Sequence, residues 1–344
     1  MTIRTATSAA LITAVGGLLL TGCVAGEGSA VADSGDDAGT WSADALTVDF
    51  ATYNPLSLII REQGWLEETL GPDVTVEWVQ SAGSNKANEL LRSGAVDVGS
   101  TAGSAALLAR ANGSPIHTVA LYDQPEWSAI VVPEGSDITS VEDLAGRSVA
   151  ATRGTDPYFF LLQSLDEHGV DLADVEVQNL QHADGRVALE NGAVDAWAGL
   201  DPIMADTELN AGSRLVYRNV DFNTYGFLNA TEDFLETSPD LAQLVVDAYE
   251  KAREWAAENP EETVEILAEV AGIEPDVAEK VILERTNLGI GAAPGEAQRA
   301  VLEVVGPIFV ETGDVSSQEQ IDAALDTLFD DTYARRADAS TLAD

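Results

Sequence analysis

A tetrapeptide occurs twice in this chain, and each copy has similar surroundings. Gly94-Ala95-Val96-Asp97 recurs as Gly192-Ala193-Val194-Asp195. Upstream of each copy lies an apolar run, over residues 74–79 in the first case and 175–180 in the second. Further upstream, Asn54-Pro55 parallels Asp156-Pro157. Three matches in the same order indicate two halves with one structural plan, which constrains the fold more than any other feature of the sequence.

Each half alternates predicted strands and helices. The first half has strands over residues 46–51, 74–79 and 95–98, and helices over 55–70 and 87–92. The second has strands over 148–152, 175–180 and 194–198, and helices over 158–168 and 186–190. This alternation predicts an α/β protein in which each half is a parallel βαβ unit with right-handed crossovers.

The pattern changes after Asp201-Pro202. Two short strands around a turn are predicted over residues 215–219 and 225–229. The remaining chain is predicted to be mostly helical, over residues 241–258, 260–271, 275–286, 295–312 and 317–329. Their apolar spacing is typical of helices that pack on a core.

The N-terminus has the pattern of an export signal. One cation, Arg4, precedes an apolar run over residues 9–20, which is too short to span a bilayer. Leu20-Thr21-Gly22-Cys23 follows and resembles the lipobox of bacterial lipoproteins, in which the cysteine is acylated. We therefore expect a signal peptide over 1–22, lipidation at Cys23, and a flexible acidic tether over 23–45. The alternative is a plain secretory signal with an incidental cysteine.

The charge and the scarcity of reactive side chains exclude several classes of function. The chain has 17 Lys and Arg against 59 Asp and Glu, a formal net charge of −42, so binding to a phosphate backbone is not expected. One cysteine and three histidines leave no multi-cysteine metal site, and no histidine lies next to a plausible nucleophile. We expect no metal, no cofactor and no enzymatic activity.

Several stretches resemble the extracytoplasmic solute-binding proteins of bacterial ABC importers, and most closely the group that binds aliphatic sulfonates, taurine, nitrate and thiamine precursors. The stretches are Leu90 to Gly99, Ser128 to Pro133, Ser140 to Ala150, and Asp195-Ala196-Trp197-Ala198-Gly199-Leu200-Asp201-Pro202. The loop Arg153-Gly154-Thr155-Asp156-Pro157 departs from the Lys-Gly-Ser type of turn that the family often has, which leaves the identity of the ligand open.

This resemblance implies a bilobed type 2 periplasmic-binding-protein fold with two crossovers and C-terminal helices. Lobe 1 would comprise residues 46–127 plus 222–344, and lobe 2 residues 128–221. The implied function is capture of a small anionic or zwitterionic solute, with an aliphatic sulfonate favoured. A lipid-anchored monomer would deliver this solute to ABC permease subunits at the outer face of the cell membrane. Taurine, nitrate or pyrimidine binding, a ligand sensor, and an enzyme on a related fold are the alternatives.

Ligands of open α/β sheets bind outside the carboxyl ends of the strands, which here are rich in Gly, Ser and Thr. Helix N-termini in these loops offer N–H groups to an anion, glycines allow close approach, and hydroxyls add donors. The candidate ligand-binding residues are Asn54, Gly83, Thr101, Gly103, Ser104, Ser128, Gly154, Thr155, Trp197 and Asp201. For Asn54 the alternative is a helix cap, and for Trp197 it is a core position. Asp201 could repel an anion or pair with an amine.

Overall fold

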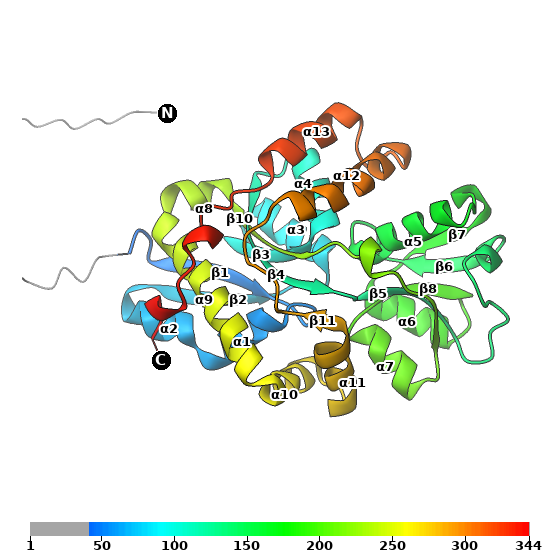
Figure 1. The fold of residues 1–344 in the computed structure, drawn as a ribbon, viewed down its shortest axis with the longest axis horizontal. Helices are drawn as coiled ribbons and strands as arrows, with labels where there is room; N and C mark the ends of the chain where they lie inside the picture. The colour runs from blue at the N-terminus through cyan, green and yellow to red at the C-terminus, as the bar shows by residue number, and fades with distance from the viewer. Residues whose placement is uncertain (1–40, 344) are drawn as a thin grey trace, which may run out of the picture. The chain divides into compact units, whose positions relative to one another are not determined.

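The structure, a computed structural model, describes residues 41–343. The predicted signal peptide, Cys23 and most of the predicted tether lie outside these residues. Residues 41–343 form two β-sheets with helices packed around them (Figure 1). No helix in this part of the chain is both long and apolar enough to cross a bilayer.

The first sheet has strand order β11-β4-β10-β3-β1-β2. Its strands are β1 (Ala45–Phe50), β2 (Thr75–Gln80), β3 (Val98–Ala102), β4 (Ile116–Pro125), β10 (Gly226–Thr231) and β11 (Thr286–Asn287). The helices between its early strands are α1 (Pro55–Gln63), α2 (Trp65–Leu70), α3 (Ser84–Ser93) and α4 (Gly103–Ala111). Strands β1, β2 and β3 are parallel, whereas β10 is antiparallel to β3 and β4.

The second sheet repeats this plan with order β7-β6-β8-β5-β9. Its strands are β5 (Ser128–Val132), β6 (Ser148–Ala151), β7 (Glu176–Asn179), β8 (Ala196–Leu200) and β9 (Arg214–Tyr217). Helices α5 (Asp156–Glu167), α6 (His182–Glu190) and α7 (Ile203–Asn210) accompany them. The α/β class with two βαβ units is thus confirmed.

The repeated tetrapeptide makes the same contact in both halves. Gly94 and Gly192 have φ of 67° and 68°, in the left-handed region that only glycine adopts readily. The Asp97 N–H then donates to the Thr47 carbonyl of β1, and the Asp97 Oδ2 accepts from the Thr47 N–H, both at 2.8 Å. Asp195 does the same with Ser148 of β6, at 2.9 Å and 2.8 Å. The tetrapeptide recurs because, in each half, its aspartate connects the start of the third strand to the beginning of the first strand by hydrogen bonds.

The chain passes between the sheets twice. It leaves the first sheet after Pro125 and enters the second at Ser128, and it returns between Tyr217 and Gly226. The guanidinium of Arg218 binds the carboxylate of Glu126 at 2.6 Å and 2.9 Å, so the two crossovers are tied together.

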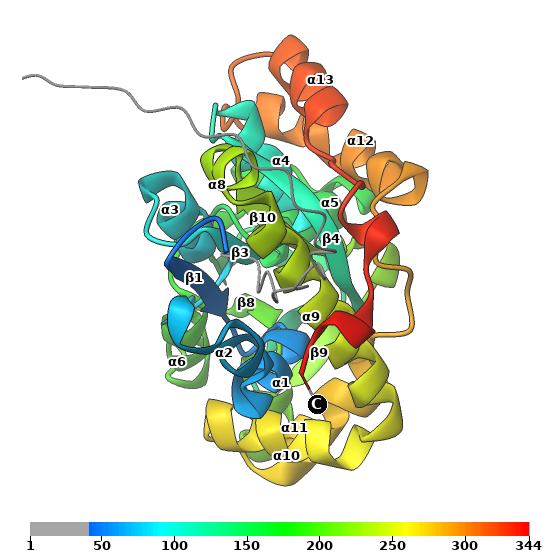
Figure 2. The same cartoon turned by 90° about the vertical axis from the view of Figure 1, so that its left-hand side faces the viewer.

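The remaining helices pack around the first sheet. They are α8 (Glu232–Thr237), α9 (Pro239–Glu258), α10 (Pro260–Ala271), α11 (Pro275–Glu279), α12 (Glu296–Glu311) and α13 (Gln318–Thr327). Helix α9 lies against α1 and β4. Helices α12 and α13 lie against α4, whereas α10 lies against α1 and α11 (Figures 1 and 2). The rings of Phe159 in α5 and Phe309 in α12 are 4.5 Å apart, so α12 also touches the second half.

Three sequence expectations are wrong in detail. The helix predicted over 55–70 is two helices, because Gly64 adopts φ 68° and ends the first. The strands predicted over 215–219 and 225–229 are not a hairpin, since β9 pairs with β5 and β10 lies between β3 and β4. The helix predicted over 275–286 ends at Glu279 and continues as a π-helical turn, Lys280–Arg285.

We expect Asp97→Ala and Asp195→Ala each to lower the free energy of unfolding by about 1 kcal/mol, because each removes the acceptor of a strand N–H. Asp97→Asn and Asp195→Asn keep an acceptor oxygen and should cost clearly less. Urea unfolding of the four variants measures this. If the alanine variants are as stable as the parent chain, the tie does not stabilise the two halves.

Candidate functional site

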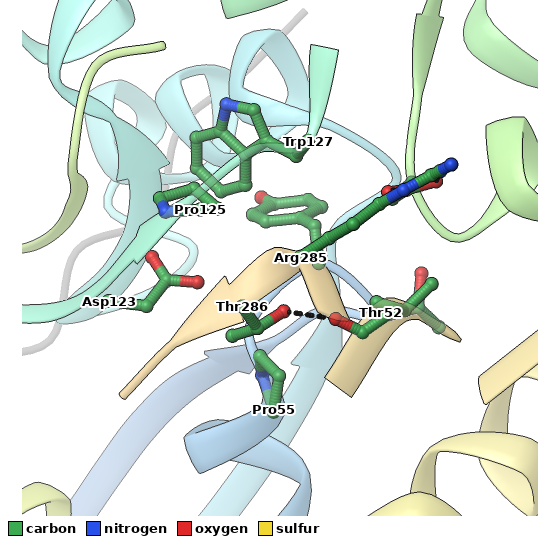
Figure 3. Close-up of a pocket in the computed structure, with 10 residues that line it drawn as sticks. Thr52, Pro55, Asp123, Pro125, Trp127, Arg285 and Thr286 are labelled. Carbon is green, nitrogen blue, oxygen red and sulfur yellow. Dashed lines mark hydrogen bonds and ion pairs between the residues drawn. The ribbon is translucent and has the colours of Figure 1, made fainter. Parts of the chain in front are cut away.

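Two small hollows lie where the carboxyl ends of strands from the two sheets meet. The first is lined by Thr52, Tyr53, Pro55, Asp123, Pro125, Trp127, Asp201, Val281, Arg285 and Thr286 (Figure 3). The second is lined by Tyr53, Ser84, Ala102, Trp127, Thr155, Asp156, Pro157 and Leu200. Each has a free volume of about 10 Å³, which is room for about one water molecule. Tyr53 and Trp127 line both, so the two hollows form one cleft with an aromatic partition.

The aromatic partition is fixed by its neighbours. The ring of Trp127 meets that of Tyr53 edge-on at 6.0 Å and that of Tyr122 at 6.5 Å. The Tyr53 hydroxyl donates to the Ser100 carbonyl at 2.9 Å and lies 3.0 Å from the Ser81 hydroxyl. Trp127 belongs to the first crossover, which places its indole between the two sheets.

The carboxylate of Asp156, at the start of α5, joins three separate segments. Its Oδ1 accepts from the hydroxyls of Ser104 at 2.6 Å and Thr224 at 2.7 Å. Its Oδ2 accepts from the Trp127 indole N–H and from the Thr224 backbone N–H, both at 2.8 Å. Burial raises the pKa of Asp156, and these donors partly offset the increase. All four donors are neutral. They resemble the neutral donors that the sequence predicted for an anionic ligand, but in the structure they bind a carboxylate of the protein itself.

A buried ion pair forms another wall of the first hollow. The guanidinium of Arg285 lies 3.1 Å and 3.2 Å from the two carboxylate oxygens of Asp201 and also binds Glu208. Asp201 accepts one further bond from the Ala205 N–H at 2.9 Å. Burial raises the pKa of Asp201 to about 6, and the charge of Arg285 opposes the increase. The pair connects the end of β8 to the segment that follows α11.

Asp123, near the end of β4, is the least satisfied group in the cleft. Only 1% of its surface is exposed, and its Oδ1 makes no hydrogen bond of normal geometry, although the nearby Gly226 N–H lowers the pKa of the carboxyl group. It packs against Gly226, where a Cβ would lie 2.1 Å from Oδ1, so only glycine fits beside it.

The structure brings some of the predicted site residues to the cleft. Thr155 and Asp201 line the hollows, and Ser104 reaches the cleft through Asp156. The hydroxyl of Ser128 is fully buried and has no partner among the described residues, while its backbone N–H donates to Asn223 at 2.9 Å. Arg153, the one cation of the predicted loops, lies 5.4 Å over the ring of Tyr158 and lines neither hollow.

The structure gives other predicted residues a packing role. Asn54 caps α1 by accepting from the Ser57 N–H, and its amide donates to the Tyr249 hydroxyl at 2.9 Å. The Thr101 hydroxyl donates to the Ala102 carbonyl at 2.9 Å and accepts from Asn229 at 2.9 Å.

The three predicted glycines meet protein neighbours at close range. A Cβ at Gly103 would lie 2.9 Å from the Phe227 ring, and one at Gly83 would lie 3.1 Å from His182 in the other half. Gly154 adopts φ 77° and faces Asn85, to which a Cβ would be 3.8 Å. Close approach is thus required at Gly83 and Gly103, but between parts of the protein.

Trp197 does not line the cleft. It is fully buried in an apolar cluster on the face of the second sheet that α6 and α7 cover, with Ala129, Val131, Ala150, Leu189, Val194 and Met204. A Cβ at Gly185 in α6 would lie 2.8 Å from its Nε1, so the glycine leaves room for the indole. The side chain points away from the cleft because it lies inside β8 rather than at its carboxyl end.

Asp123 and Arg285 line the cleft but were not predicted from the sequence as site residues. Asp123 lies in β4, which the repeat does not contain, and Arg285 lies in the helical tail, to which only packing was assigned. The sequence offered no distinct signal for Arg285, since Lys280 borders the apolar Val281-Ile282-Leu283 run and Glu284 separates that run from Arg285. In residues 41–343 no group of three or more His, Cys, Asp or Glu side chains is placed to hold a metal ion.

Asp49 is buried next to the aromatic partition, and its ionisation should make the free energy of unfolding depend on pH. It accepts from Ser81 and from both the N–H and the hydroxyl of Ser100, and burial raises its pKa to about 7. Because the folded-state pKa exceeds the unfolded value near 4, its contribution is full below pH 4 and is lost as the pH rises through 7.

We expect the stability of the parent chain relative to Asp49→Asn to fall by roughly 2–4 kcal/mol between pH 4 and pH 7. Denaturant unfolding at several pH values measures the difference, with the exposed Asp221→Asn as the control. A difference that stays constant over this range would show that Asp49 is ionised in the folded chain as readily as in the unfolded one.

Three comparisons place this chain among known proteins. The family described as NMT1/THI5 like matches residues 57–263. Two curated relatives are named as aliphatic sulfonates-binding proteins. The Escherichia coli protein is 28% identical over 264 residues, covering 76% of this chain and 82% of its own length. The Bacillus subtilis protein is 26% identical over 235 residues, covering 67% and 70%.

Solved structures agree on the fold. The alkanesulfonate-binding protein SsuA from Xanthomonas axonopodis, bound to MOPS, gives a TM-score of 0.74 at 23% identity and covers 82% of this chain and 98% of its own. The periplasmic aliphatic sulphonate binding protein SsuA from Escherichia coli gives 0.71 at 25% identity, covering 84% and 93%. The desulfurization enzyme DSZB also shares the fold, with 0.62 at 16% identity, covering 85% and 98%. The bilobed periplasmic-binding-protein fold is thus confirmed.

Proposed function

Because the chain belongs to the NMT1/THI5-like family, we propose that it captures an aliphatic sulfonate and delivers it to an ABC importer. The observation that carries this proposal is the similarity to the Escherichia coli aliphatic sulfonates-binding protein over three quarters of this chain. The position of the cleft supports it, since ligands of α/β sheets bind at the carboxyl ends of the strands. The proposed lobes are residues 46–127 plus 222–344 and residues 128–221.

The cleft offers a sulfonate two kinds of contact. Arg285 is the one cationic side chain among the described residues that line the hollows, and it already pairs with Asp201 and Glu208. In this proposal the negative head joins those two carboxylates around the guanidinium. Tyr53 and Trp127 present aromatic surface to an alkyl chain. The donors around Asp156 are already engaged by its carboxylate, and they hold the cleft walls rather than the solute.

The proposed role is binding and not catalysis. The one cysteine of the sequence is Cys23, and none of the described residues that line the cleft carries a thiol. His182 is buried beside Thr152, and burial lowers its pKa to about 4. His117 and His168 contact Glu232 and Glu142. None of the three histidines lines either hollow.

The proposed location is the outer face of the cell membrane. The predicted signal peptide over 1–22 and the Leu20-Thr21-Gly22-Cys23 motif support processing and acylation at Cys23. Acyl chains hold a protein by burial of their methylenes, and more than one chain gives stable anchoring. The tether over 23–45 would then separate a monomeric binding protein from the bilayer and let it reach the permease subunits.

Titration calorimetry with 1-butanesulfonate tests the function. We expect saturable binding to the folded chain, and Arg285→Gln should weaken it about tenfold or more, because a charge-assisted hydrogen bond is lost. Arg153→Gln, which removes an exposed cation outside the hollows, is the matched control and should bind normally. The proposal is wrong if the folded parent chain binds no alkanesulfonate of any chain length.

Cell fractionation tests the anchor. We expect Cys23→Ser to release the protein from the membrane or to leave it unprocessed, because serine has no thiol to acylate. The mass of the mature N-terminus of the parent chain should show acyl groups on Cys23. A Cys23→Ser protein that stays on the membrane with an unchanged mass would contradict lipidation.

A further inference from the structure

The two halves also meet at the edge of the cleft, where His182 packs against Gly83. Gly83 lies between β2 and α3 and has φ 130°, and a Cβ at this position would lie 3.1 Å from His182 Nε2. The next residue, Ser84, lines the second hollow. Only 3% of the surface of His182 is exposed, so the contact excludes water from the imidazole. The ring therefore helps to close the cleft at this edge.

Hydrogen bonds fix the tautomer of the His182 ring. The Thr152 hydroxyl donates its one proton to the Leu180 carbonyl at 2.6 Å, so it can only accept from His182 Nδ1, which lies 3.2 Å away. A neutral imidazole that donates from Nδ1 carries a lone pair on Nε2. This Nε2 atom makes no hydrogen bond with any of residues 41–343.

A second acceptor in the same contact is also unpaired. Asn85 of α3 donates from Nδ2 to Gln181 Oε1 at 3.5 Å, which is a further bond between the halves. Its Oδ1 has no partner in the described part of the chain, and a Cβ at Gly83 would lie 3.0 Å from it. The contact therefore brings two unpaired acceptors to one glycine.

The surroundings of the ring oppose a positive charge. His182 is the first residue of α6, and the positive end of a helix dipole disfavours a cation. The charged side chains on the elements around the ring are Lys86 and Glu89 of α3, Arg153 after β6, Asp184, Arg186 and Glu190 of α6, and Asp206 of α7. Lys86 pairs with Glu89, and Arg186 pairs with carboxylates of α6 and α7. Burial is the one cause that lowers the pKa of His182 to about 4.

We infer that the neutral ring of His182 holds the cleft closed and that its protonation opens the cleft, so that acid weakens solute binding. This inference rests on the proposed function. Opening would expose the ring to water and return its pKa to an ordinary value of about 6.5. Above that pH the ring is neutral in both forms, and closure carries no penalty. As the pH falls from about 6.5 toward 4, the open form gains a proton that the closed form excludes.

A competing explanation predicts the opposite sign. A protonated His182 Nε2 could donate to Asn85 Oδ1, which would strengthen the contact between the halves. Acid would then raise the affinity for the solute instead of lowering it. The sign of the pH effect that depends on His182 decides between the two.

Titration calorimetry with 1-butanesulfonate at pH 7.5 and pH 5.0 measures this effect. His182→Gln keeps a polar side chain that does not titrate, and it retains Asp201, whose own titration cancels when the two chains are compared. We expect the parent chain to lose roughly ten- to thirtyfold more affinity than His182→Gln between the two pH values. His168→Gln, which removes a histidine outside the hollows, is the matched control and should behave like the parent chain.

Equal losses in the parent chain and in His182→Gln would overturn the inference, and so would a smaller loss in the parent chain. An NMR titration of the His182 ring tests it without any variant, because the coupling of two binding events is reciprocal. If protonation weakens solute binding, the bound solute must lower the pKa of the ring. A pKa that is equal or higher in the saturated chain would contradict the inference, even if His182→Gln does not fold.

Failure of the proposed function can be told apart from failure of this inference. If the folded parent chain binds no alkanesulfonate, small-angle scattering of the chain alone still tests His182. A radius of gyration that increases from pH 7.5 to pH 5.0 more in the parent chain than in His182→Gln would support opening by protonation. An equal change in both chains would contradict it.

Discussion

The buried carboxylate of Asp156 joins the two halves through four hydrogen bonds. It collects a hydroxyl from the start of α4, an indole N–H from the first crossover, and a hydroxyl and an N–H from the second. Because the bonds converge on two oxygens, the start of α5 has a defined position relative to both crossovers. Opening the cleft about the crossovers would have to break the Ser104 bond, since Ser104 alone of these donors lies outside them.

Four buried aspartates lie in or next to the cleft, and each has a different set of partners. Asp49 is held by serine donors, Asp201 by an arginine, Asp156 by four neutral donors, and Asp123 retains a free oxygen. Buried charges without partners are expensive, so the first three arrangements stabilise the walls. A chain of net charge −42 can therefore recognise a sulfonate only through local partners, because long-range attraction is absent.

The sequence was informative about the fold because the fold is partly a duplication. The Gly-Ala-Val-Asp repeat predicted two βαβ units, and the structure shows that Asp97 and Asp195 make the same tie in each. Strand β4 and the helical tail have no counterpart in the repeat, and both cleft residues that sequence reasoning missed, Asp123 and Arg285, come from them. Trp197 was ambiguous for another reason, since an aromatic near a strand end can face the cleft or the core. Its direction depends on register, and Gly185 in a distant helix leaves the space for it.

A crystal structure of the chain with 1-butanesulfonate bound tests the central claim most directly, because it locates the solute relative to the two sheets. We predict a solute in the cleft, with its alkyl chain against Tyr53 and Trp127 and its sulfonate toward Arg285. A solute bound outside both hollows, or one that takes the place of Asp156 among its four donors, would contradict it.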